Sequence, residues 1–313
     1  FEIEDAEYVG SLGALQALRI ATPPRAMSGL RISLLHRSTA RREDEIGDEE
    51  AANRADVHFA GCKTDQLTVH LGGAESDAVA LYEQIFGHCI GVHLRYLDRF
   101  GDAVVLTASP DCLEQIGFDE REALFPSDER IFSGFDLLRE YFMFPRKFLG
   151  FRLNGLQRLL ARVPARRLDI IFVFDEVHAR LPAFVKPGAF ALYAAPAINL
   201  FEMTTDRIPV RANQHEFHVV PDRSRTLDFE AHRILDVHAH YRGGAHKTRV
   251  APLYSVMNGG RLREPDLSYT IRRMPRRRTT SEKRGGAASN YTGTDMFISL
   301  VEPATADSET SVA

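Results

Sequence analysis

The residues with the clearest chemical potential are an acidic pair that follows an apolar run. In the stretch IIFVFDEVHAR, at positions 170–180, five apolar residues lead directly into Asp175 and Glu176. Nucleotide-driven motors carry a Walker B strand of this form, in which an acid holds the Mg²⁺ of the nucleotide. The rest of the sequence must therefore be searched for the other half of such a site, the phosphate-binding loop.

A phosphate-binding loop reads G-x-x-x-x-G-K-[ST], because its backbone N–H groups must cradle the phosphates. Nothing upstream of the acidic pair fits this pattern. Downstream, Lys247 and Thr248 have Tyr241 and His246 at the two glycine positions, so the cradle is missing. We therefore predict that residues 170–174 form a core strand and that the acids are its solvated end. A nucleotide-binding motor that uses the acidic pair stays as an alternative.

Two histidines separated by one residue are the second candidate site. His238 and His240 lie in the stretch LDVHAHY, and on a strand both imidazoles would project from one face, about 7 Å apart. That spacing suits a shared metal ion, but a metal site needs further ligands. Residues 247–313 contain no histidine. We therefore predict no metal, cofactor or small-molecule substrate, with a metal-dependent hydrolase using His238 and His240 as a further alternative.

The composition is that of a globular, water-soluble chain. Its 313 residues are 44% hydrophobic and 26% charged, and the formal net charge of -4 gives no general attraction to nucleic acid. No apolar run approaches the roughly 20 residues that span a bilayer. The three cysteines form no C-x-x-C pair, which indicates a reducing, cytoplasmic compartment. The sequence starts at Phe1 without a signal-peptide pattern, and we expect it to be a piece of a longer protein.

Short segments of alternating polarity predict an α+β fold that is mainly β, with β-sandwich-like domains joined by a helical segment. We expect a first β-rich domain at 1–118, with one helix and an acidic loop at 41–56. A helical connector should span 119–163. A second β-rich domain should span 164–313 and carry a basic loop at 272–290, which is either solvated or a dock for an acidic partner.

The expected connector holds a dense group of aromatic residues. Apolar side chains recur there at helical spacing, and Pro145 should end or kink that helix near Phe144. Proteins that assemble through large surfaces present apolar patches rich in aromatic and arginine side chains. We therefore predict a partner interface made of Phe142, Phe144, Arg146, Phe148 and Phe151. The prediction fails for any of these side chains that is buried within its own domain.

The same block carries a resemblance to a known family. The stretch FDLLREYFMFPRKFLGFRL, at 135–153, resembles the signature of the TssF family, also called ImpG or VasA, of type VI secretion system baseplates. The stretch LTVHLGGAESDAVALYEQI, at 67–85, is similar to the family's strand, Gly-Gly turn and helix. Segments at 198–210, 215–225 and 292–303 resemble later blocks in the same order. The resemblance therefore covers nearly the whole chain.

The resemblance implies a structural, non-enzymatic role and a fold similar to the wedge proteins of contractile-phage baseplates. Two TssF copies would join one TssG to form the wedge core, and TssK and TssE would attach to that core. Six wedges would surround the VgrG spike hub. The bacterial assembly would form in the cytoplasm, at the inner face of the inner membrane and without insertion into it. The family offers no catalytic residues and implies neither nucleic acid nor a small-molecule substrate.

Overall fold

A computed structural model describes residues 1–37, 58–126, 135–211, 213–226, 228–241, 247–254, 267–276 and 293–302. The acidic loop at 41–56 and most of the basic loop at 272–290 lie outside these residues. The chain divides into two compact units. Unit 1 comprises Phe1–Pro126 and Gly134–Ala197, and unit 2 comprises Ser127–Ser133 and Ile198–Ala313.

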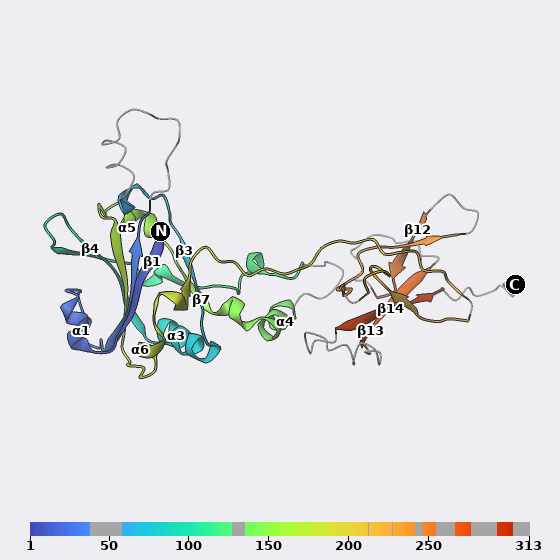
Figure 1. Ribbon diagram of the computed structural model, residues 1–313, viewed down its shortest axis with the longest axis horizontal. Coiled ribbons are helices and arrows are strands. Elements are labelled where there is room, and N and C mark those ends of the chain that lie inside the picture. The colour runs from blue at the N-terminus through green and yellow to red at the C-terminus, as the bar shows by residue number, and fades with distance from the viewer. Residues whose placement is uncertain are drawn as a thin grey trace, which may run out of the picture. The chain divides into compact units, whose positions relative to one another are not determined.

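A five-stranded antiparallel sheet forms one layer of unit 1 (Figure 1). Its strands in order are β1 (Glu2–Val9), β2 (Ser28–Leu35), β8 (Arg167–Phe174), β4 (Cys89–Leu97) and β5 (Ala103–Thr107). The central strand, β8, pairs with β2 on one side and with β4 on the other. Residues 170–174 are all buried, as expected for a strand covered on both faces. The predicted core strand is confirmed.

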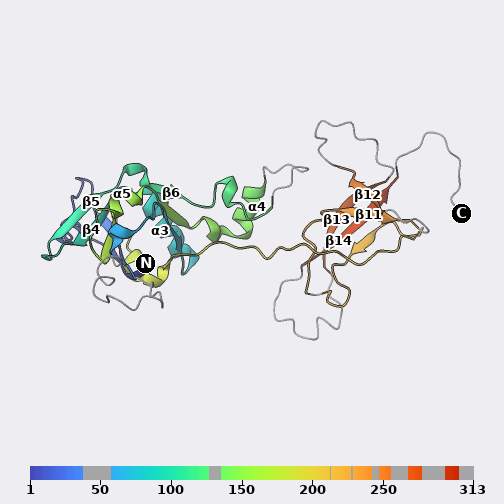
Figure 2. The same cartoon turned by 90° about the horizontal axis from the view of Figure 1, so that it is seen from above.

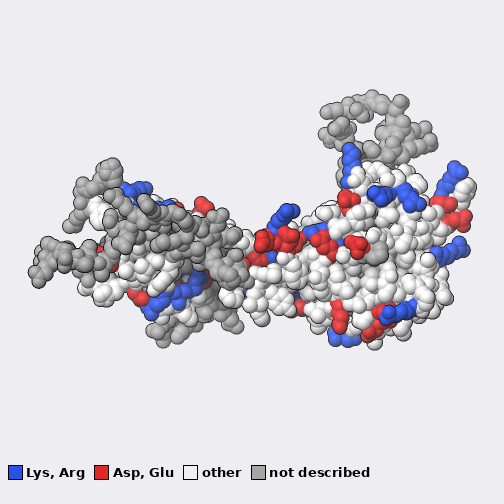
Figure 3. Space-filling model, turned by 180° about the vertical axis from the view of Figure 1, so that it is seen from behind, with Lys and Arg blue, Asp and Glu red and all other residues white. Residues whose placement is uncertain are grey.

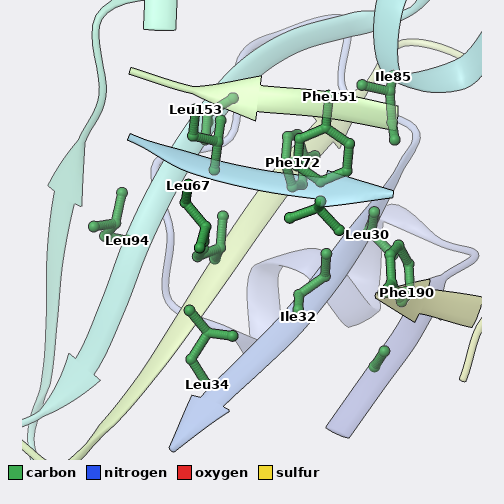
Figure 4. Packing of buried hydrophobic residues seen from close by; sticks show 14 of the residues in the cluster. Leu30, Ile32, Leu34, Leu67, Ile85, Leu94, Phe151, Leu153, Phe172 and Phe190 are labelled. Carbon is green, nitrogen blue, oxygen red and sulfur yellow. The ribbon is translucent and has the colours of Figure 1, made fainter. Parts of the chain in front are cut away.

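A four-stranded sheet forms the second layer of unit 1. Its strands in order are β6 (Leu113–Gln115), β7 (Gly150–Leu153), β3 (Leu67–Leu71) and β9 (Phe190–Ala191). One cluster of buried side chains draws on both sheets, and the rings of Phe151 and Phe172 meet edge-on with centroids 5.3 Å apart (Figure 4). Unit 1 is therefore sandwich-like, and the expected α+β, mainly β fold is confirmed.

Helices pack against both faces of the larger sheet. On α3 (Glu75–Gly87), Ala78, Leu81 and Ile85 form a buried stripe at helical spacing. On the opposite face of the larger sheet, Leu15 of α1 (Leu12–Ala17) packs near Ile171 of β8. The other helices among the described residues of unit 1 are α4 (Asp136–Met143), α5 (Leu156–Leu160) and α6 (Leu181–Phe184). Single 3-10 turns are η1 (Phe59–Gly61), η2 (Pro110–Cys112), η3 (Glu120–Glu122), η4 (Pro145–Phe148) and η5 (Pro187–Ala189).

Unit 2 is built on a mixed five-stranded sheet. Its strands in order are β10 (Phe217–Val219), β14 (Thr294–Val301), β13 (Ser268–Pro275), β12 (Lys247–Pro252) and β11 (Val237–His240). The pair β12–β13 is parallel and the other pairs are antiparallel. Phe217, Val250, Tyr269 and Met296 supply buried apolar side chains.

The two units do not follow the domain boundaries expected from the sequence. We expected a connector at 119–163 and a second domain from 164, but the chain returns to unit 1 at Gly134, before α4, and stays there to Ala197. Strand β7 pairs with β3 and β6, and β8 fills the central place between β2 and β4. Residues 170–174 are apolar toward both faces, which suits the central position that β8 takes in the larger sheet of unit 1.

We expect Gly150→Ala to destabilise unit 1. A Cβ at this position would lie 2.6 Å from the carbonyl oxygen of Val69 on the paired strand, so the backbone would have to shift. The loss in the free energy of unfolding should be about 1–3 kcal/mol. Gly13→Ala in α1 is the control, because a Cβ at this position meets nothing within 4 Å. This substitution should raise the free energy of unfolding by up to about 1 kcal/mol. Urea unfolding measures both variants, and equal stabilities would contradict this packing.

Candidate interaction surface

A buried ion pair anchors α4 to the body of unit 1. The side chain of Glu140 on α4 is 2% exposed and that of Lys147 on η4 is 1% exposed. One carboxylate oxygen of Glu140 accepts from the Lys147 ammonium, and the other accepts from the backbone N–H groups of Leu124 (2.7 Å) and Phe125 (2.9 Å). Because a buried charge is stable only when paired, this contact holds α4, η4 and residues 124–125 together.

The electrostatics of this contact favour the ionised carboxylate. Burial tends to raise the pKa of Glu140, but hydrogen bonds from Lys147 and from the N–H groups of Phe125 and Leu124 outweigh it and hold the pKa below its ordinary value. The Arg139 guanidinium also lies over the ring of Phe125, 3.8 Å from its centroid. Residues 124–125, which precede α4, and Lys147, which follows it, therefore both contact this helix.

The outer side of α4 is apolar and exposed. Glu140 is the buried residue of this helix, so α4 turns a charge inward and hydrophobic side chains outward. This is the reverse of an ordinary amphipathic surface helix. The exposed fractions are 67% for Phe135, 45% for Leu137, 52% for Leu138, 51% for Tyr141, 76% for Phe142, 67% for Met143 and 40% for Phe144. Exposed apolar groups this dense are typical of interaction surfaces, and we call this set the α4 surface.

The predicted interface residues fall into two groups. Phe142 and Phe144 belong to the α4 surface, and Arg146 is half-buried and donates to the carbonyl oxygen of Gly73 (2.7 Å). Phe148 and Phe151, in contrast, are 3% and 1% exposed. For these two residues the interface prediction is wrong, because their rings lie inside unit 1, where Phe151 fills the core between the sheets.

The acidic pair after β8 serves the fold. The carboxylate of Asp175 accepts from Arg25 (2.8 Å) and contacts His88 Nδ1 (3.1 Å), and the other ring nitrogen of His88 lies 3.3 Å from Glu176. The Asp175 side chain is 17% exposed and that of Glu176 is 59% exposed. The predicted solvated end is therefore correct for Glu176 and wrong for Asp175, which two partners shield.

The backbone of the same turn is held by a buried polar network. The Tyr8 hydroxyl accepts from the N–H of His178 (2.8 Å) and donates to the side chain of Gln84 (3.2 Å). The Ser28 hydroxyl contacts that of Tyr8 (2.9 Å) and donates to the carbonyl oxygen of Glu176. The polar groups of Tyr8, Ser28 and Gln84 are therefore hydrogen-bonded inside the unit. The turn after the strand that resembles a Walker B strand is fixed to β1 and β2 by these bonds.

The candidate metal pair lies on the surface of unit 2. His238 and His240 are both exposed on β11, as expected for alternate residues of a strand, and the nearby Asp236 pairs with Arg249 (2.7 Å). His246 lies outside the described residues. Within the described part of the chain, no cluster of three or more His, Cys, Asp or Glu side chains could hold a metal ion.

The remaining polar candidates also have structural partners. Arg272 pairs with Glu216, Arg273 donates to the carbonyl oxygen of His232, and Arg276 pairs with Asp295. These contacts tie the start of the predicted basic loop to unit 2 itself. Cys62, Cys89 and Cys112 are free thiols. Burial raises the pKa of Cys89 to about 11, which suppresses thiolate reactivity.

Sequence reasoning missed the ion pair that anchors the α4 surface. Glu140 and Lys147 are seven residues apart with Pro145 between them, so no helical spacing links them. The available signal was an acid, Glu140, that is followed directly by the apolar Tyr141 and Phe142. In the structure this acid points inward, and the apolar residues face the solvent.

The fold and the α4 surface together define a class of protein: a two-unit, mainly β scaffold that presents a firmly held apolar surface. Comparison with known proteins makes this specific. The sequence matches the family model described as "Type VI secretion system, TssF" over residues 1–313, and the chain belongs to the TssF family.

Two known proteins resemble the chain over nearly its whole length. It is 33% identical over 301 residues to the type VI secretion system component TssF1 of Pseudomonas aeruginosa, covering 96% of this chain and 45% of the relative. Its fold matches a chain of the cryo-electron microscopy structure of the TssK-TssF-TssG baseplate subcomplex, with a TM-score of 0.57 and 22% identity, over 95% of this chain and 48% of that one. The chain thus spans about half the length of these proteins.

Removing one partner of the buried pair should destabilise unit 1 strongly. We expect Lys147→Met to lower the free energy of unfolding by about 3–5 kcal/mol, because it leaves the Glu140 carboxylate buried without its cation. The double variant Glu140→Gln, Lys147→Met should lose less than the sum of the two single variants. Urea unfolding of the three variants measures the coupling, and strictly additive losses would contradict the pairing.

The same pair predicts a pH dependence. The folded-state pKa of Glu140 lies below its ordinary value of 4.5, so its contribution to stability is present above pH 4.5 and is lost as the pH falls through the folded-state pKa. Between pH 6 and about pH 3, the native chain should lose more stability than Glu140→Gln. Parallel pH-dependent unfolding curves for the two proteins would rule out this assignment.

Asp175→Asn should have a mild effect. The residue keeps its shape but loses the ion pair with Arg25, whose side chain is 80% exposed, so the loss should stay below about 1 kcal/mol. In calorimetric titrations with Mg²⁺, the native chain should bind no more Mg²⁺ than the Asp175→Asn variant. Such binding would restore the nucleotide-motor alternative.

Proposed function

We propose that the chain is part of a structural subunit of the type VI secretion baseplate wedge and that the α4 surface contacts another subunit. The carrying observation is that α4 exposes its apolar side chains while a buried ion pair holds it in place. Membership of the TssF family and the fold shared with a chain of the TssK-TssF-TssG subcomplex support this proposal.

The partner interface of this proposal consists of Phe142 and Phe144, with Arg146 at its edge. Large aromatic side chains contribute most to binding when they enter a desolvated pocket of the partner. Because the buried pair already holds α4, little conformational entropy is lost on binding. We infer that TssG supplies the complementary apolar surface.

We further propose that the subunit assembles with TssG, a second TssF copy, TssK and TssE, around the VgrG spike hub. The site of assembly would be the cytoplasm at the inner face of the inner membrane. None of the described helices has both the length and the apolar character to cross a membrane. On the face shown in Figure 3, charged side chains of both signs occur in small groups separated by uncharged areas, a pattern that favours protein partners over nucleic acid.

A role in assembly calls for no catalytic site, and we infer that the chain is not an enzyme. No observation favours the two alternatives. Asp175 and Glu176 both contact His88, and Asp175 also pairs with Arg25, so both acids have partners within the fold. His238 and His240 are solvent-facing neighbours on an edge strand.

The double substitution Phe142→Ser, Phe144→Ser in the full-length protein should weaken TssG binding by about thirtyfold or more, since central aromatic residues commonly contribute over 2 kcal/mol. Stability should hardly change, because both side chains are exposed. Val79→Ser is the control, since Val79 is also an exposed apolar residue on a helix of unit 1 (48%) and should leave binding intact. Calorimetric titration measures the affinities, and equal TssG affinity in all three proteins would contradict the proposed interface.

A further inference from the structure

The hairpin that joins β4 to β5 ends in an exposed aromatic side chain. Phe100 is 74% exposed and Leu97 is 51% exposed. Strand β4 pairs with β8 only as far as Arg95, whereas its pairing with β5 continues to Leu97 and Ala103. The end of the hairpin therefore projects past the five-stranded sheet as a two-stranded ribbon, as Figures 1 and 2 show. We call residues 97–102 the hairpin tip.

The hairpin tip is held in one conformation by Asp98. Its carboxylate accepts from the N–H groups of Phe100 (2.8 Å) and Asp102 (2.9 Å). Its backbone N–H donates to the carbonyl oxygen of Asp102 (2.9 Å), and its own carbonyl accepts from Gly101 (3.0 Å). Gly101 supplies the positive φ of 85° that closes the turn. Phe100 is thus presented on a fixed loop, which lowers the entropy lost on docking.

The hairpin tip also carries two charges that are open to a partner. The Arg99 guanidinium lies 4.6 Å from the centroid of the Phe100 ring and forms no ion pair with any described residue. The carboxylate of Asp102 is likewise without a cationic partner in the described part of the chain. A docking site for the tip should therefore combine an apolar floor with one acid and one base.

A pocket of unit 1 offers apolar side chains together with one acid and two bases. It lies between the start of α3 and α6 and has a volume of about 420 Å³, more than one phenyl ring requires. We call it the α3–α6 pocket; its lining includes Asp77, Arg180, Phe184, Lys186 and Gly188. Lys186 is exposed and makes no ion pair with any described residue, and Asp77 pairs with the well-exposed Arg180.

We propose that the hairpin tip of one copy of this protein docks into the α3–α6 pocket of a second copy. Phe100 would lie against Phe184, with Arg99 directed to Asp77 and Asp102 directed to Lys186. This inference deepens the proposed function, on which it rests, by assigning the contact to the second TssF copy. The α4 surface stays available to TssG, because α4 and the hairpin tip lie at opposite ends of unit 1 in both views (Figures 1 and 2).

The proposed contact is heterologous, since the tip and the pocket are different surfaces of the same chain. Each copy therefore carries one tip and one pocket, and removing either should affect a different side of the contact. This property allows a test by complementation. A copy without a tip can still receive a tip, and a copy with a filled pocket can still donate one.

The test uses the full-length protein with Phe100→Ser, which removes the ring, and Gly188→Leu, which fills the pocket. A Cβ at Gly188 meets nothing within 4 Å, so the substitution should not disturb the fold. Each variant should weaken self-association by about tenfold in sedimentation experiments. An equimolar mixture of the two should recover association, whereas the control Val79→Ser should match the native protein.

Three outcomes would overturn the proposal: unchanged self-association of both variants, weakened association that the mixture does not recover, or no self-association of the native protein at any concentration, alone or with TssG.

Two further measurements test whether the hairpin tip binds another partner. Loss of TssG affinity in Phe100→Ser alone would assign the tip to TssG, and loss of binding to vesicles of anionic phospholipid would assign it to a membrane surface. Either result also overturns the proposal. Failure here leaves the proposed function standing if Phe142→Ser, Phe144→Ser still abolishes TssG binding.

Discussion

One ion pair sealed from water determines how this protein presents its apolar surface. Glu140 and Lys147 are both almost completely buried, and neither charge would be stable there without the other. The pair joins α4 to η4, and η4 leads directly into β7 of the smaller sheet. The position of α4 therefore depends on the sandwich core, in which Phe151 of β7 meets Phe172 of the central strand β8.

Helix α4 buries a charge and exposes aromatic side chains, an arrangement that suits a surface covered by a partner. The hydrophobic effect would normally turn the apolar face of α4 to the core. Here the buried pair, with the hydrogen bonds from Leu124 and Phe125, directs Glu140 inward instead. The exposed residues then form a surface whose free energy falls when a partner covers it, which is how members of large assemblies gain affinity.

The sequence predicts local features of this fold well and long-range ones poorly. The apolar run at 170–174 correctly indicated a core strand, and alternation along the chain correctly indicated a mainly β protein. The unit boundaries depend on pairings such as β3 with β7, across more than 80 positions, which local patterns do not contain. For the same reason, Phe148 and Phe151 could not be distinguished from the exposed Phe142. Their burial depends on residues distant in the sequence: the ring of Phe118 packs on Phe148, and β3 pairs with the strand of Phe151.

The central claim is that the outward face of α4 is a subunit contact rather than a free surface. Site-specific photo-crosslinking from position 142 of the full-length protein, within assembled complexes, tests it most directly. A crosslink to TssG should form from position 142, and none should form from the control position 79 on α3. If position 142 forms no crosslink to TssG, or crosslinks only within its own chain, in complexes that contain TssG, the α4 surface is not a contact with that subunit.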